Sequence, residues 1–195
     1  MTRSHTIRLA LAGLATLAAA ACADAPGSAL TARTPSFSAG ALAKSEKSAG
    51  RQHPVATSFT RSIDVDHKGG RIEIPEVGFR LDIPKNAIHG NLGTIHMSVT
   101  VLAGNQIAYD FQPTGLTFDQ PLQFEQDMRD LAKDASVDPA SVLQVSYFKS
   151  PADLDPAHGT ARTYEDLPSG IDFSGHTLKA DIWHFSGYIV SWSRR

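Results

Sequence analysis

The feature that most constrains the fold of this chain is an alternation of apolar and polar residues with a period of two. Leu81, for example, stands between Arg80 and Asp82, and Phe79 and Ile83 follow on either side. Successive side chains of a β-strand point to opposite faces, so this pattern predicts strands with one buried and one wet face. The segments that carry it are residues 71–74, 79–83, 95–101, 142–147, 178–182 and 188–192.

Turn-forming residues separate these segments and indicate the fold class. Lys68-Gly69-Gly70 and Gly90-Asn91 lie between segments, and prolines such as Pro75 stand at segment ends, where a missing N–H does least harm. Only residues 126–133 have a helical apolar face, and Pro139 ends any extension. Many short strands with one short helix predict an all-β antiparallel β-sandwich, preceded by a signal peptide and a flexible tether.

Residues 1–21 have the composition of a secretory signal peptide. Arg3 and Arg8 supply a short basic region, and from Leu9 to Ala21 the chain is almost wholly apolar or small. This stretch is shorter than the about 20 apolar residues that a membrane-spanning helix needs. The segment therefore predicts export of the protein, and it is excluded from the fold.

Cys22 is the only cysteine of the chain and follows Ala19-Ala20-Ala21. This sequence resembles a lipobox, in which lipoprotein signal peptidase cleaves before a cysteine that carries diacylglycerol. A lone cysteine in an exported protein has no intramolecular disulfide partner, and acylation explains its thiol. We therefore expect lipid attachment at Cys22. Ordinary secretory cleavage after an Ala-x-Ala set is the alternative, and it would give a freely secreted or periplasmic protein.

Residues 22–58 differ in composition from the rest of the chain. Ala, Ser, Gly, Thr and Pro dominate, large apolar residues are few, and neither the helical nor the strand period persists. Such a segment buries too little surface to offset the entropy of ordering, so we expect a disordered tether. The remaining residues, 59–195, have the length of one domain.

Charge and motifs argue against several classes of function. Removal of residues 1–21 takes away two basic residues and no acidic one, so Lys+Arg falls from 18 to 16 against 20 Asp+Glu and the net charge changes from −2 to −4. Nucleic-acid binding needs a basic surface, so no nucleic-acid partner is expected. The histidines lack the spacing of a zinc site, and no nucleotide-binding loop or nucleophile elbow occurs. We expect no metal and no cofactor.

Three stretches of sequence resemble a known family. Residues 69–75 read Gly-Gly-Arg-Ile-Glu-Ile-Pro, and residues 78–88 read Gly-Phe-Arg-Leu-Asp-Ile-Pro-Lys-Asn-Ala-Ile. With the Pro-Thr-Gly-Leu-Thr-Phe-Asp-Gln-Pro segment of residues 113–121, they resemble the ZU-five domain, the β-sandwich of ankyrins, netrin receptors and related death-domain proteins. The resemblance covers less than half of the domain and implies a β-sandwich. Family partners such as spectrin are not carried over, because no contact surface is matched.

One triplet near the C-terminus carries candidate chemistry. Some ZU-five domains cleave themselves between the last two residues of a His-Phe-Ser triplet, and His184-Phe185-Ser186 matches it. In that mechanism Ser186 Oγ attacks the Phe185 carbonyl carbon, and His184, two residues earlier on the same strand face, is the general base. The alternative is three ordinary strand residues, with Phe185 in the core and His184 and Ser186 meeting solvent or a backbone partner.

The sequence as a whole favours a non-enzymatic, lipid-anchored protein of the cell envelope whose β-sandwich binds a partner or serves a structural role. Ala23 stands where an aspartate would retain a lipoprotein at the inner membrane, so the outer membrane is favoured in a two-membrane bacterium. A self-cleaving domain, cut between Phe185 and Ser186, and a freely secreted sandwich are the alternatives. The membrane is contacted through Cys22, and the sequence does not identify a protein partner.

Overall fold

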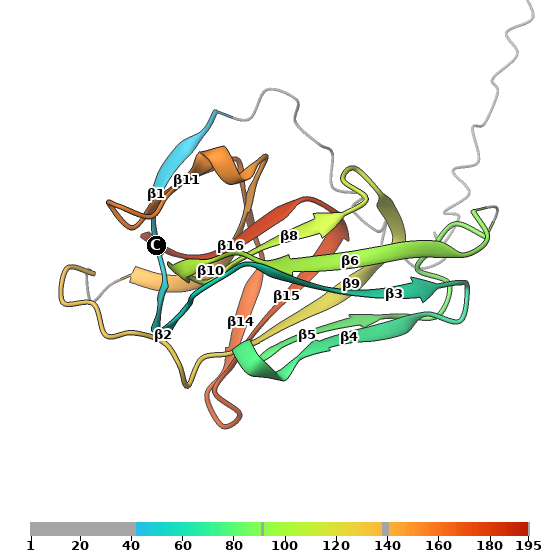
Figure 1. The fold of residues 1–195 in the computed structure, drawn as a ribbon, viewed down its shortest axis with the longest axis horizontal. Helices are drawn as coiled ribbons and strands as arrows, with labels where there is room; N and C mark the ends of the chain where they lie inside the picture. Colours follow the sequence, from blue (N-terminus) through green and yellow to red (C-terminus); the bar gives the residue numbers. More distant parts are fainter. Residues whose placement is uncertain (1–41, 91, 138–140, 195) are drawn as a thin grey trace, which may run out of the picture. The chain divides into compact units, whose positions relative to one another are not determined.

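The computed structural model describes residues 42–90, 92–137 and 141–194, and their strands form two large antiparallel sheets (Figure 1). Sheet I has nine strands, which are β1 (Lys44–Ser48), β3 (Phe59–Val65), β6 (Ile95–Val101), β8 (Ala108–Gln112), β10 (Ser141–Phe148), β11 (Leu154–Asp155), β12 (Thr160–Thr163), β13 (Glu165–Leu167) and β16 (Gly187–Arg194). They follow the order β11-β12-β1-β16-β8-β6-β3, and β10 pairs with both β13 and β16.

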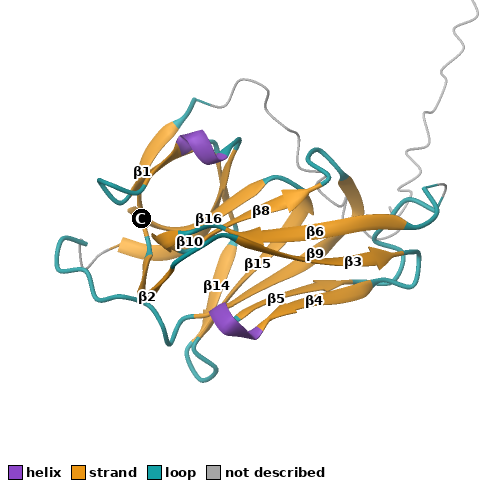
Figure 2. Cartoon of the chain, viewed as in Figure 1, coloured by secondary structure: helices purple, strands orange, loops and turns teal. Residues whose placement is uncertain are grey.

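Sheet II has five strands, in the order β14 (Ser169–Asp172), β15 (Thr177–His184), β9 (Thr117–Asp127), β5 (Phe79–Ile83) and β4 (Gly70–Ile74). A separate pair joins β2 (Gly50–Val55) to β7 (Gly104–Gln106). Helical structure in the described residues is limited to two single turns, η1 (Pro75–Val77) and η2 (Pro151–Asp153) (Figure 2). The all-β, sandwich-like fold predicted from the sequence is therefore confirmed.

The alternating residues place their apolar side chains between the two sheets, as predicted. Leu81 of β5 and Val99 of β6 are fully buried, whereas Glu73 of β4 lies exposed on the outer face of sheet II. The centre of the core is aromatic, and the ring centroids of Phe79 and Tyr109 are 4.4 Å apart. Each fully buried large apolar side chain contributes about 1.5–3 kcal/mol, so this layer supplies most of the driving force for packing.

Several strands of sheet I close into a ring. β16 pairs with β1 on one side and β10 on the other, β1 pairs with β12, and β10 pairs with β13. Because β12 and β13 are separated only by Tyr164, whose N–H donates to the Tyr147 carbonyl oxygen at 2.9 Å, the circuit is complete. We call β1, β12, β13, β10 and β16 the small barrel; its ribbons curl around one another in Figure 1.

The small barrel has an apolar end of its own. Phe148, Ala161 and Ile189 pack there with Ala108 in a second buried cluster, separate from the main core. Gly187 makes this packing possible, because a Cβ at that position would lie 2.2 Å from Cε2 of the Phe148 ring. Only glycine therefore lets the Phe148 ring lie across the beginning of β16.

The predicted helix at residues 126–133 is wrong. β9 continues to Asp127, and the residues after it form a turn and an isolated bridge between Leu131 and Arg51. Gln126 is fully buried and pairs with Phe79 of β5 and Leu178 of β15. Pairing on both sides outweighs the weak helical pattern of this short segment, as tertiary contacts commonly do.

The boundary predicted between tether and domain at residue 58 is also wrong for the residues described. β1 and β2 lie within the segment expected to be a tether, and both pair with strands of the domain. The prediction failed because the buried side chains of these strands, Glu46, Ser48 and Arg51, are polar, and large apolar residues are few. Residues 1–41, which include the predicted signal peptide and Cys22, lie outside the described residues.

This boundary predicts the behaviour of two shortened chains. A chain of residues 42–195 should fold, whereas a chain of residues 59–195 should be strongly destabilised, because the small barrel loses β1 and the core loses Arg51. Circular dichroism melting of the two chains measures the difference. A 59–195 chain that melts as cooperatively and at the same temperature as the 42–195 chain would contradict the structure.

Candidate functional site

The sequence-predicted triplet lies where the chain passes from one sheet to the other. β15 of sheet II ends at His184, Phe185 and Ser186 follow, and β16 of sheet I begins at Gly187. The sequence predicts His184 and Ser186 on one face of a continuous strand. This prediction is wrong, because β15 ends at His184. All three side chains are buried.

The imidazole of His184 packs among aromatic side chains. Its ring centroid lies 5.2 Å from that of Tyr147, and both ring nitrogens lie 3.3 Å from the hydroxyl oxygen of Tyr188. The Tyr188 hydroxyl donates to the backbone oxygen of His184 at 2.7 Å, and His184 Nε2 lies 3.9 Å from a carboxylate oxygen of Glu165. Burial, followed by the nearby Glu165 charge, raises the pKa of Tyr188 well above its usual value.

Phe185 and Ser186 are held by backbone hydrogen bonds. The N–H of Phe185 donates to Leu116 O at 2.8 Å, and its carbonyl oxygen accepts from the N–H of Gly115 at 2.9 Å. The Phe185 ring is fully buried and lies 5.3 Å from the Phe111 ring. Ser186 Oγ donates to the Phe148 carbonyl oxygen at 3.5 Å, a long and weak hydrogen bond. These contacts anchor the crossover between the sheets.

A second candidate site is a cleft of about 630 Å³ at one end of the sandwich. The β2–β3 connection, η1 and the segment after β9 form its walls. Its apolar lining consists of Pro54, Val55, Phe59, Pro75 and Val77. Clefts of this size that combine apolar walls with a few polar groups are the usual places for ligand binding.

The charged residues around the cleft are arranged as ion pairs. Asp127 accepts from Arg129 Nε at 2.8 Å, and Arg129 holds the pKa of the Asp127 carboxyl below its usual value. His53 Nδ1 lies 2.6 Å from a carboxylate oxygen of Asp130. Glu76 pairs with Arg61, which projects from β3, at 2.7 Å. Because each of these charges lies beside a charge of opposite sign, the cleft offers an apolar surface and no strong electrostatic potential of one sign.

Beneath the cleft, a buried polar network fixes its floor. Arg51 donates through Nη2 to the hydroxyl oxygen of Tyr109 at 2.7 Å and through Nη1 to the carbonyl oxygen of Val77 at 3.1 Å. The Tyr109 hydroxyl donates to Oε1 of Gln126, and Gln126 Nε2 donates to the same Val77 carbonyl at 2.8 Å. Val77 also lines the cleft, so this network sets the position of its backbone there.

The β14–β15 hairpin, which bonds to the segment after β9, carries an exposed aromatic residue. Phe173, at the tip of the β14–β15 hairpin, is 82% exposed. Asp172 accepts hydrogen bonds from the N–H and Oγ of Ser174 and from the N–H of Gly175, and the Ser174 hydroxyl lowers the pKa of the Asp172 carboxyl. The hairpin tip therefore has a defined shape.

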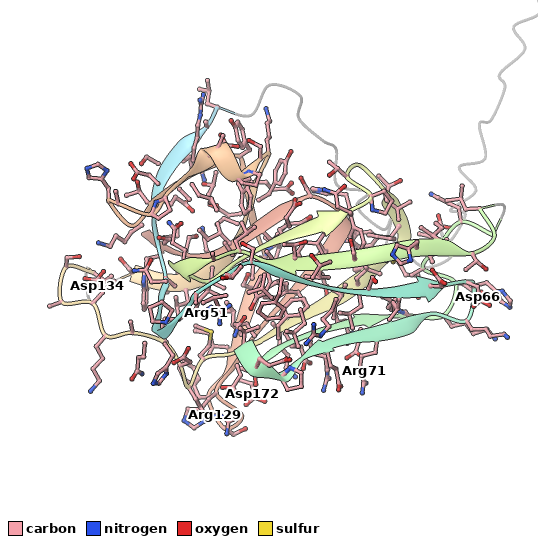
Figure 3. The ribbon with its side chains drawn as sticks, in the orientation of Figure 1. Arg51, Asp66, Arg71, Arg129, Asp134 and Asp172 are labelled. Carbon is pink, nitrogen blue, oxygen red and sulfur yellow. The ribbon has the colours of Figure 1, made fainter. Side chains whose placement is uncertain are left out.

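The hairpin tip and the cleft are neighbours in the structure. The carbonyl oxygen of His176 accepts from the N–H of Met128 at 2.7 Å, next to the Asp127 and Arg129 that line the cleft. In Figure 3, Arg129 and Asp172 lie close together at the lower edge of the view, and Asp66 lies apart from them at the right. We call the cleft and Phe173 together the end surface.

Sequence reasoning missed the end surface. A lone Arg51 in a polar stretch and a single Phe173 in a turn carry no periodic signal, and their roles depend on residues far away in the chain. The turn at Ser174-Gly175 does indicate a hairpin, and an aromatic residue directly before such a turn is the one available clue.

Comparisons with known proteins give no identity. No family model matches the chain, and no curated protein matches it. The resemblance to the ZU-five domain therefore stays a prediction. Within the described ranges, no cluster of three or more His, Cys, Asp or Glu side chains is placed to bind a metal ion, and no helix has the length and apolarity to span a bilayer.

The buried network predicts a pH dependence. Burial raises the pKa of Tyr109 to about 12 from 10.0, although the charge and hydrogen bond of Arg51 lower it. The folded state keeps the phenol proton that the unfolded state loses, so this stabilisation is complete below pH 10 and disappears as the pH rises to 12. Above pH 10 the free energy of unfolding should fall more steeply in the wild type than in Tyr109→Phe, by up to about 1.4 kcal/mol per pH unit.

Urea unfolding at a series of pH values between 9 and 12 measures the two slopes. Tyr109→Phe should also lower the free energy of unfolding by about 1–3 kcal/mol at neutral pH, because the buried guanidinium of Arg51 loses an acceptor. Parallel pH profiles for the two proteins would contradict the assignment.

Proposed function

We propose that this protein is a non-enzymatic, lipid-anchored protein of the cell envelope whose β-sandwich binds a partner protein through the end surface. The observation that carries the binding role is Phe173, an aromatic side chain held out into solvent on an ordered hairpin beside an apolar cleft. Exposed aromatic residues beside a pocket are typical of the few residues that dominate a protein interface. Loops at the end of a sandwich are also where such folds carry binding sites.

The matched charges around the cleft support a partner that inserts an apolar side chain. With Asp127 paired to Arg129 and Glu76 paired to Arg61, a charged ligand group would have to break an existing pair. An apolar side chain would instead cover Val55, Phe59 and neighbouring prolines without disturbing those pairs. Each buried methylene of that side chain contributes about 0.8 kcal/mol.

A photo-crosslinking amino acid in place of Phe173 tests the binding role in intact cells. Substitution at Phe173 should give an adduct of discrete mass, whereas the same substitution at His158 should give none. The His158 side chain is 79% exposed and lies in the turn between β11 and β12, away from the end surface. Equal labelling at both positions, or none at Phe173, would refute a role for this surface.

The anchor rests on Ala19-Ala20-Ala21-Cys22, and replacement of Cys22 by serine tests it. If Cys22 carries the lipid, the variant should move from the detergent-extracted membrane fraction to the soluble fraction, because each buried acyl CH₂ contributes about 0.8 kcal/mol of membrane affinity. Ser28→Ala, close by but outside the lipobox, should leave the protein in the membrane fraction. An unchanged distribution of Cys22→Ser would favour the freely secreted alternative.

The second candidate function is a single self-cleavage between Phe185 and Ser186. One observation favours it: the N–H of Gly115 donates to the Phe185 carbonyl oxygen, where negative charge would develop during attack. The resemblance of His184-Phe185-Ser186 to the triplet that some ZU-five domains cleave supports the same idea.

Intact mass after complete unfolding separates the two functions. The binding role predicts one full-length species, with His184 and Phe185 contributing only to packing. Self-cleavage predicts a fragment ending at Phe185, which disappears in Ser186→Ala and persists in Ser186→Cys, because a thiol makes the same acyl shift. His184→Ala would slow such cleavage by about 10²–10⁴-fold if the imidazole is the base.

A further inference from the structure

The interior of the small barrel holds a group of buried oxygen atoms that belongs to neither the end surface nor the triplet. Glu46 projects into it from β1, Ser146 from β10 and Ser191 from β16. Glu46 is 9% exposed, and both serines are fully buried. Asp166 of β13 stands opposite Ser146 and completes the group.

These oxygen atoms make more close contacts with one another than their hydroxyl hydrogens can serve as hydrogen bonds. Ser146 Oγ lies 3.0 Å from Glu46 Oε2, 3.2 Å from Asp166 Oδ1 and 2.7 Å from Ser191 Oγ, and Ser191 Oγ lies 2.9 Å from Glu46 Oε2. Each serine hydroxyl has one hydrogen, and a carboxylate has none. With both carboxyl groups ionised, four oxygen–oxygen contacts share two hydrogens, so two of the contacts lack a proton.

The negative charge of the group is only partly balanced. Lys44 Nζ lies 2.8 Å from Asp166 Oδ2, the oxygen that faces away from Ser146. Among the described residues, no Lys, Arg or His nitrogen lies within 4.0 Å of the Glu46 carboxylate. Gln144 Nε2 donates to Glu46 only at 3.4 Å. The charge of Lys44 also acts on Glu46, so one lysine faces two carboxylates. Two carboxylates beside a single lysine favour the binding of a further positive charge.

Thr163 provides a second and independent indication of a ligand. Thr163 is fully buried, and within the described residues its Oγ1 has no hydrogen-bond partner. It stands opposite Lys44 on β12, and Lys44 and Glu46 share one face of β1, so the Thr163 side chain points into the same interior. A buried hydroxyl without a partner costs about 1–3 kcal/mol unless a ligand satisfies it.

We propose that the small barrel binds one hard cation, such as calcium, between the carboxylates of Glu46 and Asp166 and the hydroxyl groups of Ser146, Ser191 and Thr163. Calcium takes six to eight oxygen ligands at about 2.3–2.6 Å, and ligands that share such a shell lie about 3 Å apart. That is the spacing of the oxygen atoms around Ser146. The site uses two carboxylates and neutral oxygens, and it contains no histidine or cysteine.

Glu46 is the member of this group that borders a hollow at the protein surface. A hollow of about 390 Å³ opens onto Glu46 between β1 and the end of β16, with Trp192 in its wall. The two lysines on its rim are each paired, Lys44 with Asp166 and Lys47 with Asp134 at 3.1 Å, so they do not present unbalanced positive charge to an entering ion.

Calcium binding to the purified full-length protein tests the proposal. After removal of metal with EDTA, calorimetric titration with calcium chloride should show one site per chain, and the melting temperature should rise with calcium concentration. Glu46→Gln, which keeps the shape of the side chain, should weaken binding at least about tenfold, and Thr163→Val should weaken it less. Glu73→Gln, an exposed acid on sheet II, is the matched control and should bind calcium as the wild type does.

Three results would overturn the proposal. The first is the absence of saturable calcium binding to a folded wild-type protein. The second is equal calcium affinity in the wild type and Glu46→Gln. The third is a melting temperature that rises as the pH falls but does not respond to calcium, which would show that the carboxylates of Glu46 and Asp166 share a proton instead.

Discussion

The backbone of β16 is the element on which the rest of the structure depends. Its first residues, from Gly187 to Ile189, pair with β8, its last residues pair with β1, and β10 runs along its whole length. One strand thus holds together the sandwich and the small barrel. It faces two cores at once, since Tyr188 and Val190 pack in the main core while Ile189 packs in the second cluster. Loss of its pairing would separate the two parts of the domain, whereas loss of a surface ion pair would cost only about 0–1 kcal/mol.

The triplet His184-Phe185-Ser186 lies at the crossover from sheet II to sheet I, directly before β16. The Phe185 ring packs against Phe111 and Phe118, and its backbone bonds to Gly115 and Leu116 on both sides. A residue held by two backbone hydrogen bonds and by contacts with two aromatic rings joins the sheets firmly. The end surface and the small-barrel interior lie elsewhere and use different physics. The first is exposed, apolar and neutral through paired charges, and the second is buried, oxygen-rich and acidic. The exposed apolar surface of the domain and its buried acidic group are therefore separate features.

Sequence patterns were sufficient for the main sandwich and insufficient for the small barrel. Strands such as those around Leu81 and Val99 follow a strict alternation because one face of each meets the core, and this signal is local. β1 was missed because its buried residues, Glu46 and Ser48, are polar. The partners of Glu46, Ser146 and Ser191, lie 100 and 145 residues away. The His184–Ser186 relation was misjudged because alternation does not show where a strand ends. No local pattern indicates that a carboxylate will be enclosed by strands from the other end of the chain.

β1 belongs to the cooperative core of the domain through its pairing with β16. Native-state hydrogen exchange of the full chain tests this most directly, because it gives an opening free energy for each backbone amide. We expect the hydrogen-bonded amides of β1 and of Ala49 directly after it, whose N–H donates to Val190 O, to open with nearly the same free energy as the amides of β16. Exchange of the β1 amides at a free energy close to zero, with β16 still protected, would contradict it and return residues 44–55 to a tether.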